Sequence, residues 1–108
     1  MKIIENAFIP TKRYLAINLF GVIFIRYGNR RFVNEKTVRH ELIHTRQMKE
    51  LLYIPFYLWY LLEWLIKSLK HGISNAYFNI SFEREAYSNH DDIAYLKNRK
   101  MFAFLNYL

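Results

Sequence analysis

The sequence predicts an α+β fold in which a small N-terminal β-hairpin or sheet is followed by three to four helices. Residues 14–27 are rich in β-branched and aromatic side chains, which favour strands, whereas apolar residues recur at spacings of three and four after residue 37, which favours helices. No repeat, low-complexity tract or linker divides the 108 residues, so we expect a single domain over residues 1–108.

The predicted strands lie within residues 14–27, which read YLAINLFGVIFIRY. Asn18-Leu19-Phe20-Gly21 stands at the centre of this segment, and glycine supplies the positive φ that a tight turn requires. We therefore expect a short hairpin or a bent pair of strands that turns near Gly21. Residues 28–31, with the sequence GNRR, then end the β pattern.

The first helix is expected from about Glu35 to about Tyr53. Asn34 is a candidate N-cap, because its side-chain oxygen can accept a hydrogen bond from a free amide of the first turn. Apolar side chains recur along this helix on one face, and Pro55 is expected to end or kink it, because proline lacks the amide hydrogen that a helix interior needs.

Further helical patterns follow Pro55, separated by glycine or by polar residues. The segments expected to be helical are 56–70, which His71-Gly72 closes, then 81–90, and then 93–99 after Asp91-Asp92. The polar stretch 74–79 is expected to be a connection between the first two of these, and an aromatic tail begins at Met101.

Composition narrows the possible chemistry. Hydrophobic residues make up 53% of the chain and charged residues 23%, which excludes intrinsic disorder. There is no cysteine, so a disulfide framework, a thiolate zinc site and a thiol nucleophile are all excluded. Any metal must therefore be held by His, Asp or Glu. The first residues lack the pattern of a secretory signal, which favours a cytoplasmic location.

The motif that carries chemistry is His40-Glu41-Leu42-Ile43-His44, an HExxH within the first predicted helix. Imidazoles at positions i and i+4 lie one turn apart on one helix face and can bind the same zinc ion. Glu41 between them is placed to act as general base for an attacking water. The alternative reading of His40 and His44 is a pair of interior histidines that bond to the backbone or to nearby carboxylates.

Two histidines leave a catalytic zinc ion one protein ligand short, so a third must come from elsewhere in the chain. The candidates are Glu83, Glu85, His90, Asp91 and Asp92, followed by Glu63 and His71. As an alternative, Glu83 and Glu85 are solvated carboxylates at a helix start, where the helix dipole favours them. His90 is either a donor to a reaction oxyanion or a surface histidine near the two aspartates.

The segment Phe82-Glu83-Arg84-Glu85-Ala86-Tyr87 resembles the second motif of the gluzincin metallopeptidases, in which a helix downstream of HExxH carries a Glu ligand. In the branch that includes the CAAX-processing proteases, this motif is a Glu, two variable residues, Ala and then Asp. The resemblance implies Glu83, ahead of Glu85, as the third zinc ligand. It places Tyr87 where the family has an Asp that supports a zinc-bound imidazole.

The chain length, together with motifs over about residues 38–47 and 79–89, also resembles the minigluzincins, which implies a zincin-like minimal domain. The sequence thus predicts a zinc metallopeptidase in which His40, His44 and Glu83 hold Zn²⁺ and Glu41 is the general base for hydrolysis of a peptide or protein substrate. The alternative is a domain that keeps the metal or only its shape, and serves as a regulatory or interaction module at a membrane.

Two details of that peptidase concern the surroundings of the site. We expect the strand near residues 22–26 to align the substrate, because an extended peptide can pair with a strand edge. The sequence leaves open whether the aromatic tail from Met101 covers the cleft as an inhibitory segment.

The apolar run over residues 51–66 has one charge in sixteen residues and is shorter than the roughly twenty residues that span a bilayer. We expect a core helix here, with a homodimer contact or a peripheral membrane contact over residues 51–70 as alternatives. The side chains that would suit a membrane interface are Trp59, Tyr60 and Trp64, beside Lys67 and Lys70.

Sixteen Lys and Arg against nine Asp and Glu give a net charge of +7, which favours anionic partners. The basic residues are scattered, at Lys12, Arg13, Arg26, Arg30, Arg31, Arg39, Arg46 and residues 97–100. They match no recognition-helix pattern, so nucleic acid is not the expected partner, and anionic lipid explains them as well.

Overall fold

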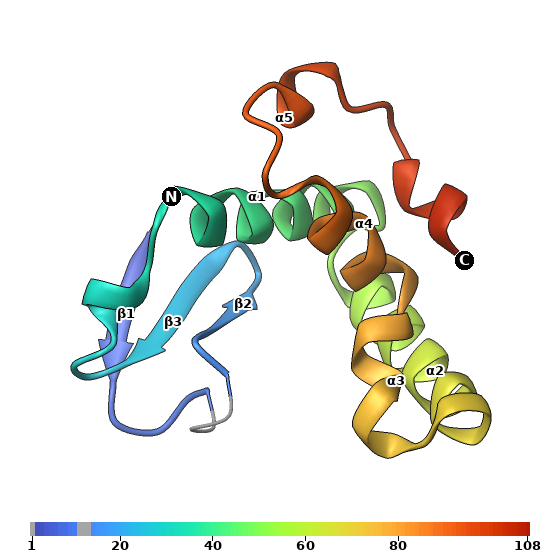
Figure 1. The fold of residues 1–108 in the computed structure, drawn as a ribbon, viewed down its shortest axis with the longest axis horizontal. Coiled ribbons are helices and arrows are strands. Elements are labelled where there is room, and N and C mark those ends of the chain that lie inside the picture. The colour runs from blue at the N-terminus through green and yellow to red at the C-terminus, as the bar shows by residue number, and fades with distance from the viewer. Residues whose placement is uncertain (1, 11–13) are drawn as a thin grey trace.

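The computed structural model describes residues 2–10 and 14–108, and it has the predicted α+β architecture (Figure 1). Lys12 and Arg13, two of the basic residues noted above, lie outside the described residues. The strands are β1 (Ile3–Asn6), β2 (Ala16–Leu19) and β3 (Val22–Arg26). The helices are α1 (Glu35–Glu50), α2 (Ile54–His71), α3 (Ile73–Asn79), α4 (Ser81–Asn89) and α5 (Tyr95–Asn98), with short 3₁₀ helices η1 (Arg30–Phe32) and η2 (Ala103–Tyr107).

The predicted hairpin is confirmed, and it forms part of a larger sheet. Strands β2 and β3 pair antiparallel from Leu19 opposite Val22, and the two turn residues Phe20 and Gly21 both have positive φ, as a two-residue type I′ turn requires. Strand β1 was not predicted; it pairs in parallel with β3. The strand order is β1-β3-β2, so β3 is central and β2 lies at an edge.

Helix α1 begins where the sequence predicts and ends earlier. The Asn34 side chain accepts a hydrogen bond of 2.9 Å from the Thr37 amide, which confirms the N-cap. The chain then turns at Leu52 and Tyr53, which both have positive φ, so the helix stops at Glu50 rather than near Tyr53. Pro55 falls in the first turn of α2, where its missing amide hydrogen costs nothing.

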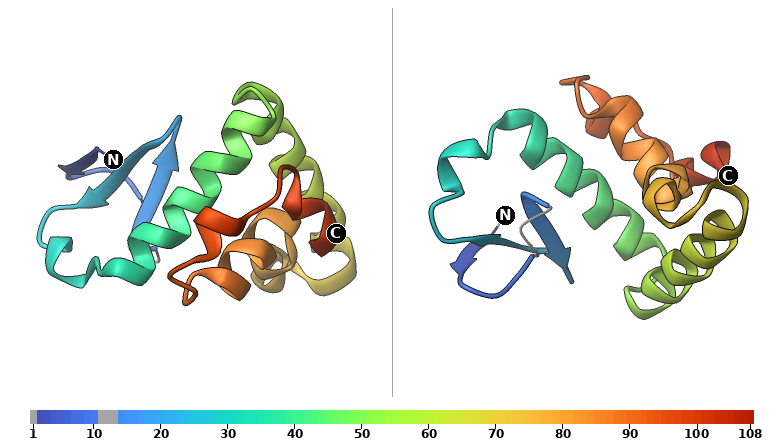
Figure 2. Two further views of the ribbon diagram at one scale, coloured as in Figure 1. Left: turned by 90° about the horizontal axis from the view of Figure 1, so that it is seen from above. Right: turned by 60° about the horizontal axis from the view of Figure 1, so that its bottom comes forward.

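Helix α1 lies between the sheet on one side and the other long helices on the opposite side (Figure 2). This central position explains why its side chains face both neighbours. Asn18 of β2 donates hydrogen bonds to the Glu41 carbonyl and to the Thr45 hydroxyl, each of 2.9 Å, and so ties the sheet to α1. The motif residues of α1 are thereby held between two layers.

Helices α2, α3 and α4 follow one another with short breaks. The predicted end of α2 is confirmed at His71, and Gly72 has φ of 85°. The polar stretch 74–79 was predicted to be a connection and is instead helix α3, which packs along α2 and buries Ala76. Tertiary packing outweighs weak local propensity in so short a helix. The last predicted helix is reduced to the four residues of α5.

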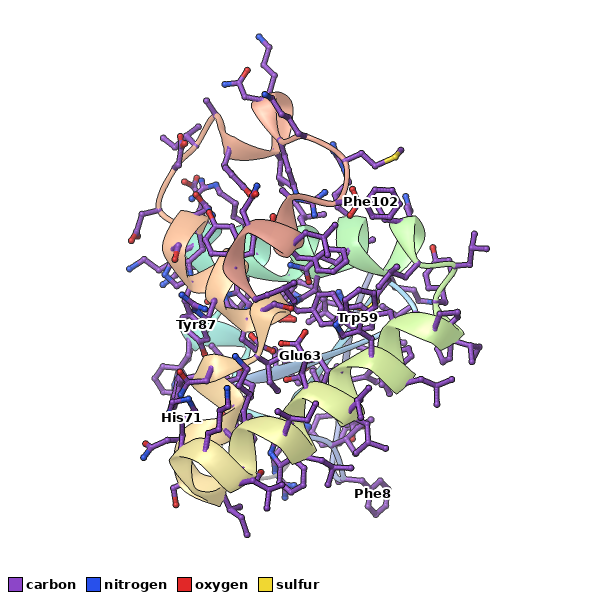
Figure 3. All side chains as sticks on the ribbon, turned by 90° about the vertical axis from the view of Figure 1, so that its right-hand side faces the viewer. Phe8, Trp59, Glu63, His71, Tyr87 and Phe102 are labelled. Atoms are coloured by element: carbon purple, nitrogen blue, oxygen red, sulfur yellow. The ribbon has the colours of Figure 1, made fainter. Side chains whose placement is uncertain are left out.

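Glu63 of α2 fixes the start of α4. Its carboxylate accepts hydrogen bonds from the Ser81 amide, at 2.8 Å, and from the Ser81 hydroxyl, while Trp59 donates to it at 2.8 Å. Figure 3 shows Glu63 and Trp59 in the space between the two helices. The carboxylate satisfies an amide that the helix leaves free and matches the positive end of the α4 dipole.

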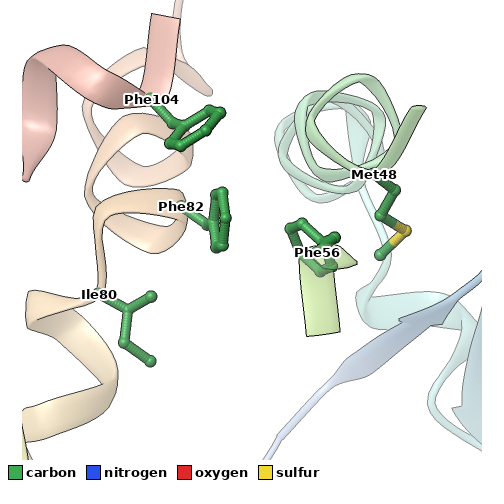
Figure 4. Close-up of a cluster of buried hydrophobic side chains, with 5 residues drawn as sticks. All are labelled: Met48, Phe56, Ile80, Phe82 and Phe104. Carbon is green, nitrogen blue, oxygen red and sulfur yellow. The ribbon is translucent and has the colours of Figure 1, made fainter. Parts of the chain in front are cut away.

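The hydrophobic core lies between α1, α2 and the C-terminal segments. It consists of Met48, Phe56, Ile80, Phe82 and Phe104 (Figure 4). The Phe82 ring centroid lies 4.5 Å from that of Phe56 and 4.7 Å from that of Phe104, so aromatic contacts join α2, α4 and η2. The aromatic tail is therefore part of the core.

Replacement of Phe104 by Ala should lower the free energy of unfolding by about 3–5 kcal/mol, because the side chain is almost fully buried and leaves a cavity. Phe8 is 84% exposed and projects from the surface (Figure 3), so Phe8→Ala is the matched control and should change stability by less than about 0.5 kcal/mol. Chemical denaturation measures both. Equal stability of the two variants would contradict the assignment of the tail to the core.

Candidate metal centre

His40 and His44 stand on successive turns of α1 and point toward α4. Their Nε2 atoms are 3.1 Å apart. Oε1 of Glu83, from the first turn of α4, lies 3.2 Å from Nε2 of His40 and 3.0 Å from Nε2 of His44. All three side chains are buried. The structure thus brings together the three ligands that the sequence predicted.

The three atoms form a triangle of a size that suits a metal ion. A tetrahedral ion with bonds of about 2 Å places neighbouring ligand atoms about 3.3 Å apart, close to the observed separations. Ligand atoms of His40, Glu41 and His44 also lie within 4.8 Å of one another, so this buried group could bind a metal ion. Of the two carboxylates, that of Glu83 is within hydrogen-bond distance of both imidazoles.

A hydrogen bond from His44 to Gln47, on the side away from Glu83, determines that Nδ1 of His44 carries a proton. Its Nδ1 lies 2.7 Å from Oε1 of Gln47. The Gln47 amide nitrogen donates to the Phe82 carbonyl and to Glu85, so its oxygen is the acceptor and Nδ1 of His44 is the donor. When His44 is neutral its lone pair is therefore on Nε2, the atom that lies 3.0 Å from Glu83.

His90 plays the corresponding part for His40. Its Nδ1 lies 3.1 Å from Nδ1 of His40, and its carbonyl accepts a hydrogen bond of 2.5 Å from Arg39. Burial lowers the pKa of His90 and so favours its neutral ring, which can accept at Nδ1 when its proton is on Nε2. His90 was predicted to be an oxyanion donor or a surface histidine; it is within 3.9 Å of Asp91, but its ring supports a motif imidazole.

The structure corrects the role considered for Tyr87. Its ring packs edge-on against His40, with centroids 4.5 Å apart, while its hydroxyl lies 3.1 Å from the Tyr77 hydroxyl. Tyr87 therefore contacts the imidazole through its ring and leaves the supporting hydrogen bond to His90. The sequence offered no signal for this, because the partner is His90, which lies three residues after Tyr87 and just beyond the end of α4.

The Glu83 carboxylate is a buried negative charge that attracts cations. Burial alone would raise its pKa, but the imidazoles of His44 and His40 outweigh burial and lower it. Burial likewise opposes the charged form of His44, and Glu83 outweighs it and raises the pKa of His44 to about 9. Tyr60 donates a hydrogen bond of 2.8 Å to Oε2 of Glu83 and leaves Oε1 for the imidazoles. The pocket thus holds either a proton or a metal ion.

Glu85 has a structural partner and does not face the triangle. Its carboxylate accepts hydrogen bonds from Gln47, Tyr95 and Arg99, and Arg99 also binds Glu50 at 2.7 Å. These contacts lower the pKa of Glu85 against the effect of burial. The choice of Glu83 over Glu85 is therefore supported by geometry.

The other candidate ligands lie away from the triangle. Glu63 caps α4, and Asp91 is exposed and pairs with Lys36 at 3.0 Å. Asp92 accepts from the Ala94 amide, and His71 is exposed at the end of α2. In the described part of the chain, none of these four side chains forms a hydrogen bond or ion pair with His40 or His44.

Glu41 faces a cleft next to the histidines. The cleft has a volume of about 420 Å³ and runs between β2 and α2, with Glu41, His44 and Glu83 on its floor. Aromatic residues of α2 and of the neighbouring segments form much of its wall, namely Tyr14, Phe56, Tyr57, Tyr60, Trp64 and Tyr77. Burial raises the pKa of Glu41 to about 7, with Glu83 adding to the effect and His44 opposing it.

The structure bears on the strand that was expected to align a substrate and on the tail, whose relation to the cleft the sequence left open. The strand expected to align a substrate, residues 22–26, is β3, and both of its edges are already paired, so that expectation is wrong. The strand that lines the cleft is β2, at the sheet edge. The aromatic tail does not cover the cleft: none of residues 101–108, all described, belongs to its lining.

The Arg99 contacts predict a strong effect of substitution on stability. Arg99→Met should lower the free energy of unfolding by about 3–5 kcal/mol, because it leaves the buried Glu85 carboxylate without its countercharge. Arg84 is the matched control, since its hydrogen bonds to the described residues go to the Tyr107 and Leu108 carbonyls at the surface, and Arg84→Met should cost about 1 kcal/mol or less. Thermal and urea denaturation distinguish them, and an equal loss in both variants would refute the role of Arg99.

The site is thus two imidazoles and a carboxylate with fixed outer hydrogen bonds, beside a second carboxylate that faces an aromatic cleft. No family model, no curated protein and no solved structure matches this chain.

Proposed function

We propose that this protein is a zinc-dependent hydrolase of peptide bonds, in which His40, His44 and Glu83 hold the ion and Glu41 is the general base. The observation that carries the proposal is the convergence of three potential ligand atoms in a buried site, 3.0 to 3.2 Å apart. Without a metal ion, shared protons hold these atoms at hydrogen-bond distance, and a metal ion between the same three atoms would take the place of those protons.

The donor set favours zinc among the common metals. Two neutral imidazoles and one carboxylate are the ligands of a catalytic zinc site that keeps its fourth position open, whereas magnesium and calcium prefer oxygen ligands alone. When bound, zinc supplies a Lewis acid that polarises a carbonyl group and makes water more acidic. The fourth position of a bound ion would be open to the cleft, because His44 and Glu83 line that cleft.

Glu41 is suited to move a proton between water and a leaving group. Its carboxylate lies at the cleft floor, and a pKa of about 7 lets it accept a proton and release it near neutral pH. In peptide hydrolysis it takes a proton from the water that attacks the carbonyl carbon. It then gives that proton to the nitrogen of the breaking C–N bond, so that a carboxylic acid and an amine leave.

The sheet edge favours an extended peptide as substrate. In the antiparallel ladder of β2 and β3, the peptide groups of Ala16 and Asn18 face outward, and β2 lines the cleft. Tyr57 already binds the Asn18 carbonyl and the Phe20 amide, and no backbone hydrogen bond from the described residues outside the sheet uses the Ala16 groups or the Asn18 amide, so these can pair with a substrate backbone. The aromatic wall of the cleft suits apolar substrate side chains.

Metal analysis of the purified protein tests the zinc assignment. We expect about one zinc ion per chain in the wild type, its loss in His44→Ala and Glu83→Gln, and its retention in Glu41→Gln and in the matched control His71→Ala. Elemental analysis and calorimetric titration with ZnCl₂ provide the measurements. A wild-type protein that stays metal-free after zinc is supplied would refute the site.

The Glu41→Gln variant then separates a hydrolase from a metal-binding module. With zinc retained, the loss of the general base should reduce hydrolysis of a quenched-fluorescence peptide library by about 10²–10⁴-fold. If the zinc-loaded wild type and the Glu41→Gln variant cleave the library equally slowly, the protein is a metal-binding domain without this activity.

Substitution of His90 and substitution of Tyr87 should have different effects on zinc affinity. His90→Phe should weaken zinc binding by about 10–100-fold, because it removes the acceptor for Nδ1 of His40. Tyr87→Phe keeps the ring that packs on His40 and should leave zinc affinity within about twofold, since its hydroxyl bonds elsewhere. Competition with a chromophoric chelator measures both. Equal affinities would overturn the role given to His90.

A further inference from the structure

The exposed side of α2 carries apolar residues where a helix that faces water normally carries polar ones. The exposed polar residues of this helix are Lys70 and His71, both in its last turn. Its other exposed residues are Ile54, Pro55, Leu58, Leu61, Leu62, Leu65, Ile66 and Leu69. At 3.6 residues per turn these eight side chains fall within an arc of about 140° around the helix axis. We call them the α2 outer face.

The spacing of residues along the α2 outer face is that of a helix that packs on another helix. Ile54, Leu58, Leu61 and Leu65 follow one another at spacings of four, three and four residues. The seam between two paired helices has this spacing, and leucine and isoleucine are its usual residues. The remaining members of the α2 outer face widen the seam on one side. The partner that fits this surface is therefore an apolar face of a helix.

The area of the α2 outer face is close to what a stable dimer needs. An unfolded chain exposes about 1.45 Å² per dalton, so a fully exposed Leu or Ile residue exposes about 165 Å². The seven Leu and Ile residues of the α2 outer face, which are 45% to 90% exposed, thus present roughly 700 Å² to solvent. Leu52 and Ile73, just beyond the helix ends, raise this to roughly 900 Å². Stable interfaces bury about 800 Å² on each partner.

The charges around the α2 outer face differ from those of a helix that lies on anionic lipid. Such a helix carries several Lys and Arg residues beside its apolar face. On α2, Lys67 and His71 lie on the opposite side of the helix, and Lys70 is the basic residue that borders the apolar arc. The arc itself holds no charged side chain. Two copies of this surface can therefore meet without bringing like charges together.

The aromatic residues of α2 face the interior of the molecule. Trp59 packs against Phe82 and Phe104, while the Tyr60 hydroxyl donates a hydrogen bond to Glu83. Trp59 and Tyr60 thus belong to the core and to the candidate metal centre, and the α2 outer face consists of aliphatic residues. Within the described part of the chain, no helix combines the length and the apolar character that crossing a bilayer requires.

We propose that the α2 outer face binds the same face of a second copy of the chain, with the two α2 helices antiparallel about a two-fold axis near Leu61 and Leu62. Leu58 of each copy then lies against Leu65 of the other. The two Lys70 side chains are about 25 Å apart in this arrangement, well beyond the Debye length of about 8 Å, whereas a parallel pair would place them side by side. Antiparallel helix dipoles also attract one another.

The dimer leaves the candidate metal centre free. None of the eight side chains of the α2 outer face, all of them described, lines the cleft at Glu41. The inference therefore stands independently of the proposed hydrolytic function.

Sedimentation velocity at increasing protein concentration tests the proposal. We expect a monomer–dimer equilibrium that does not weaken as salt rises, because the contact is apolar and salt screens the repulsion between two chains of charge +7. Leu58→Glu and Leu65→Glu should each raise the dimer dissociation constant about 100-fold or more, since each places two charges in the apolar contact. Ile93→Glu is the matched control, because Ile93 is 83% exposed in the segment between α4 and α5, and it should dimerise as the wild type does.

Single cysteines test the orientation of the two helices, because the chain has no cysteine of its own. Under mild oxidation, Leu61→Cys should form a disulfide between two copies, since residue 61 lies near the two-fold axis. Leu69→Cys should not cross-link by itself but should cross-link when it is mixed with Ile54→Cys. A disulfide between two copies of Leu69→Cys would contradict the antiparallel arrangement.

Circular dichroism of each variant verifies that it is folded, which is expected because the substituted side chains are exposed. The proposal is wrong if the wild type stays monomeric at every concentration, or if Leu58→Glu and Leu65→Glu dimerise as well as the wild type does. Co-sedimentation with vesicles of phosphatidylcholine and phosphatidylglycerol identifies the other occupant. A monomeric wild type that binds these vesicles, with binding lost in Leu65→Glu, would assign the α2 outer face to a lipid surface instead.

Discussion

The contact between the Glu83 carboxylate and the two imidazoles of α1 determines how the molecule packs. A charge with its side chain 5% exposed is stable only where partners surround it, so α4 must cross α1 at the level of His40 and His44. Outer contacts then follow from the same requirement. Gln47 forms a hydrogen bond with His44, Glu85 accepts a hydrogen bond from Gln47, and Arg99 forms an ion pair with Glu85. These contacts hold the C-terminal segment against α1.

The need for buried polar partners around Glu83 also determines where the hydrophobic core lies. The stripe that α1 turns toward α4 is polar, with His40, His44 and Gln47 at positions that an ordinary amphipathic helix fills with apolar residues. The core is therefore displaced toward α2, α4 and the tail, where Phe56, Phe82 and Phe104 meet. The chain keeps a buried polar centre because it has enough aromatic side chains to build a core beside it.

Local patterns in the sequence were sufficient for the parts of the fold that depend on neighbours in the chain. The turn at Gly21, the Asn34 cap and the spacing of His40, Glu41 and His44 all act within a few residues, and the structure has each of them. Glu83 was one of several candidate ligands, and it was chosen among them through resemblance to a second motif. The contacts of His90 and Arg99 join residues about fifty apart, and strand β1 and helix α3 depend on packing against distant segments, so no local pattern could indicate them.

The link from His44 through Gln47 and Glu85 to Arg99 bears on biosynthesis. A ribosome makes the HExxH segment early, and α1 emerges before the residue that neutralises Glu85 has been added. Until residue 99 has left the exit tunnel, Glu85 has no guanidinium partner and the acceptor that orients His44 is not held in place. The nascent chain therefore completes the hydrogen-bond chain that orients His44 only after residue 99 has emerged from the ribosome, although α1 itself emerges earlier.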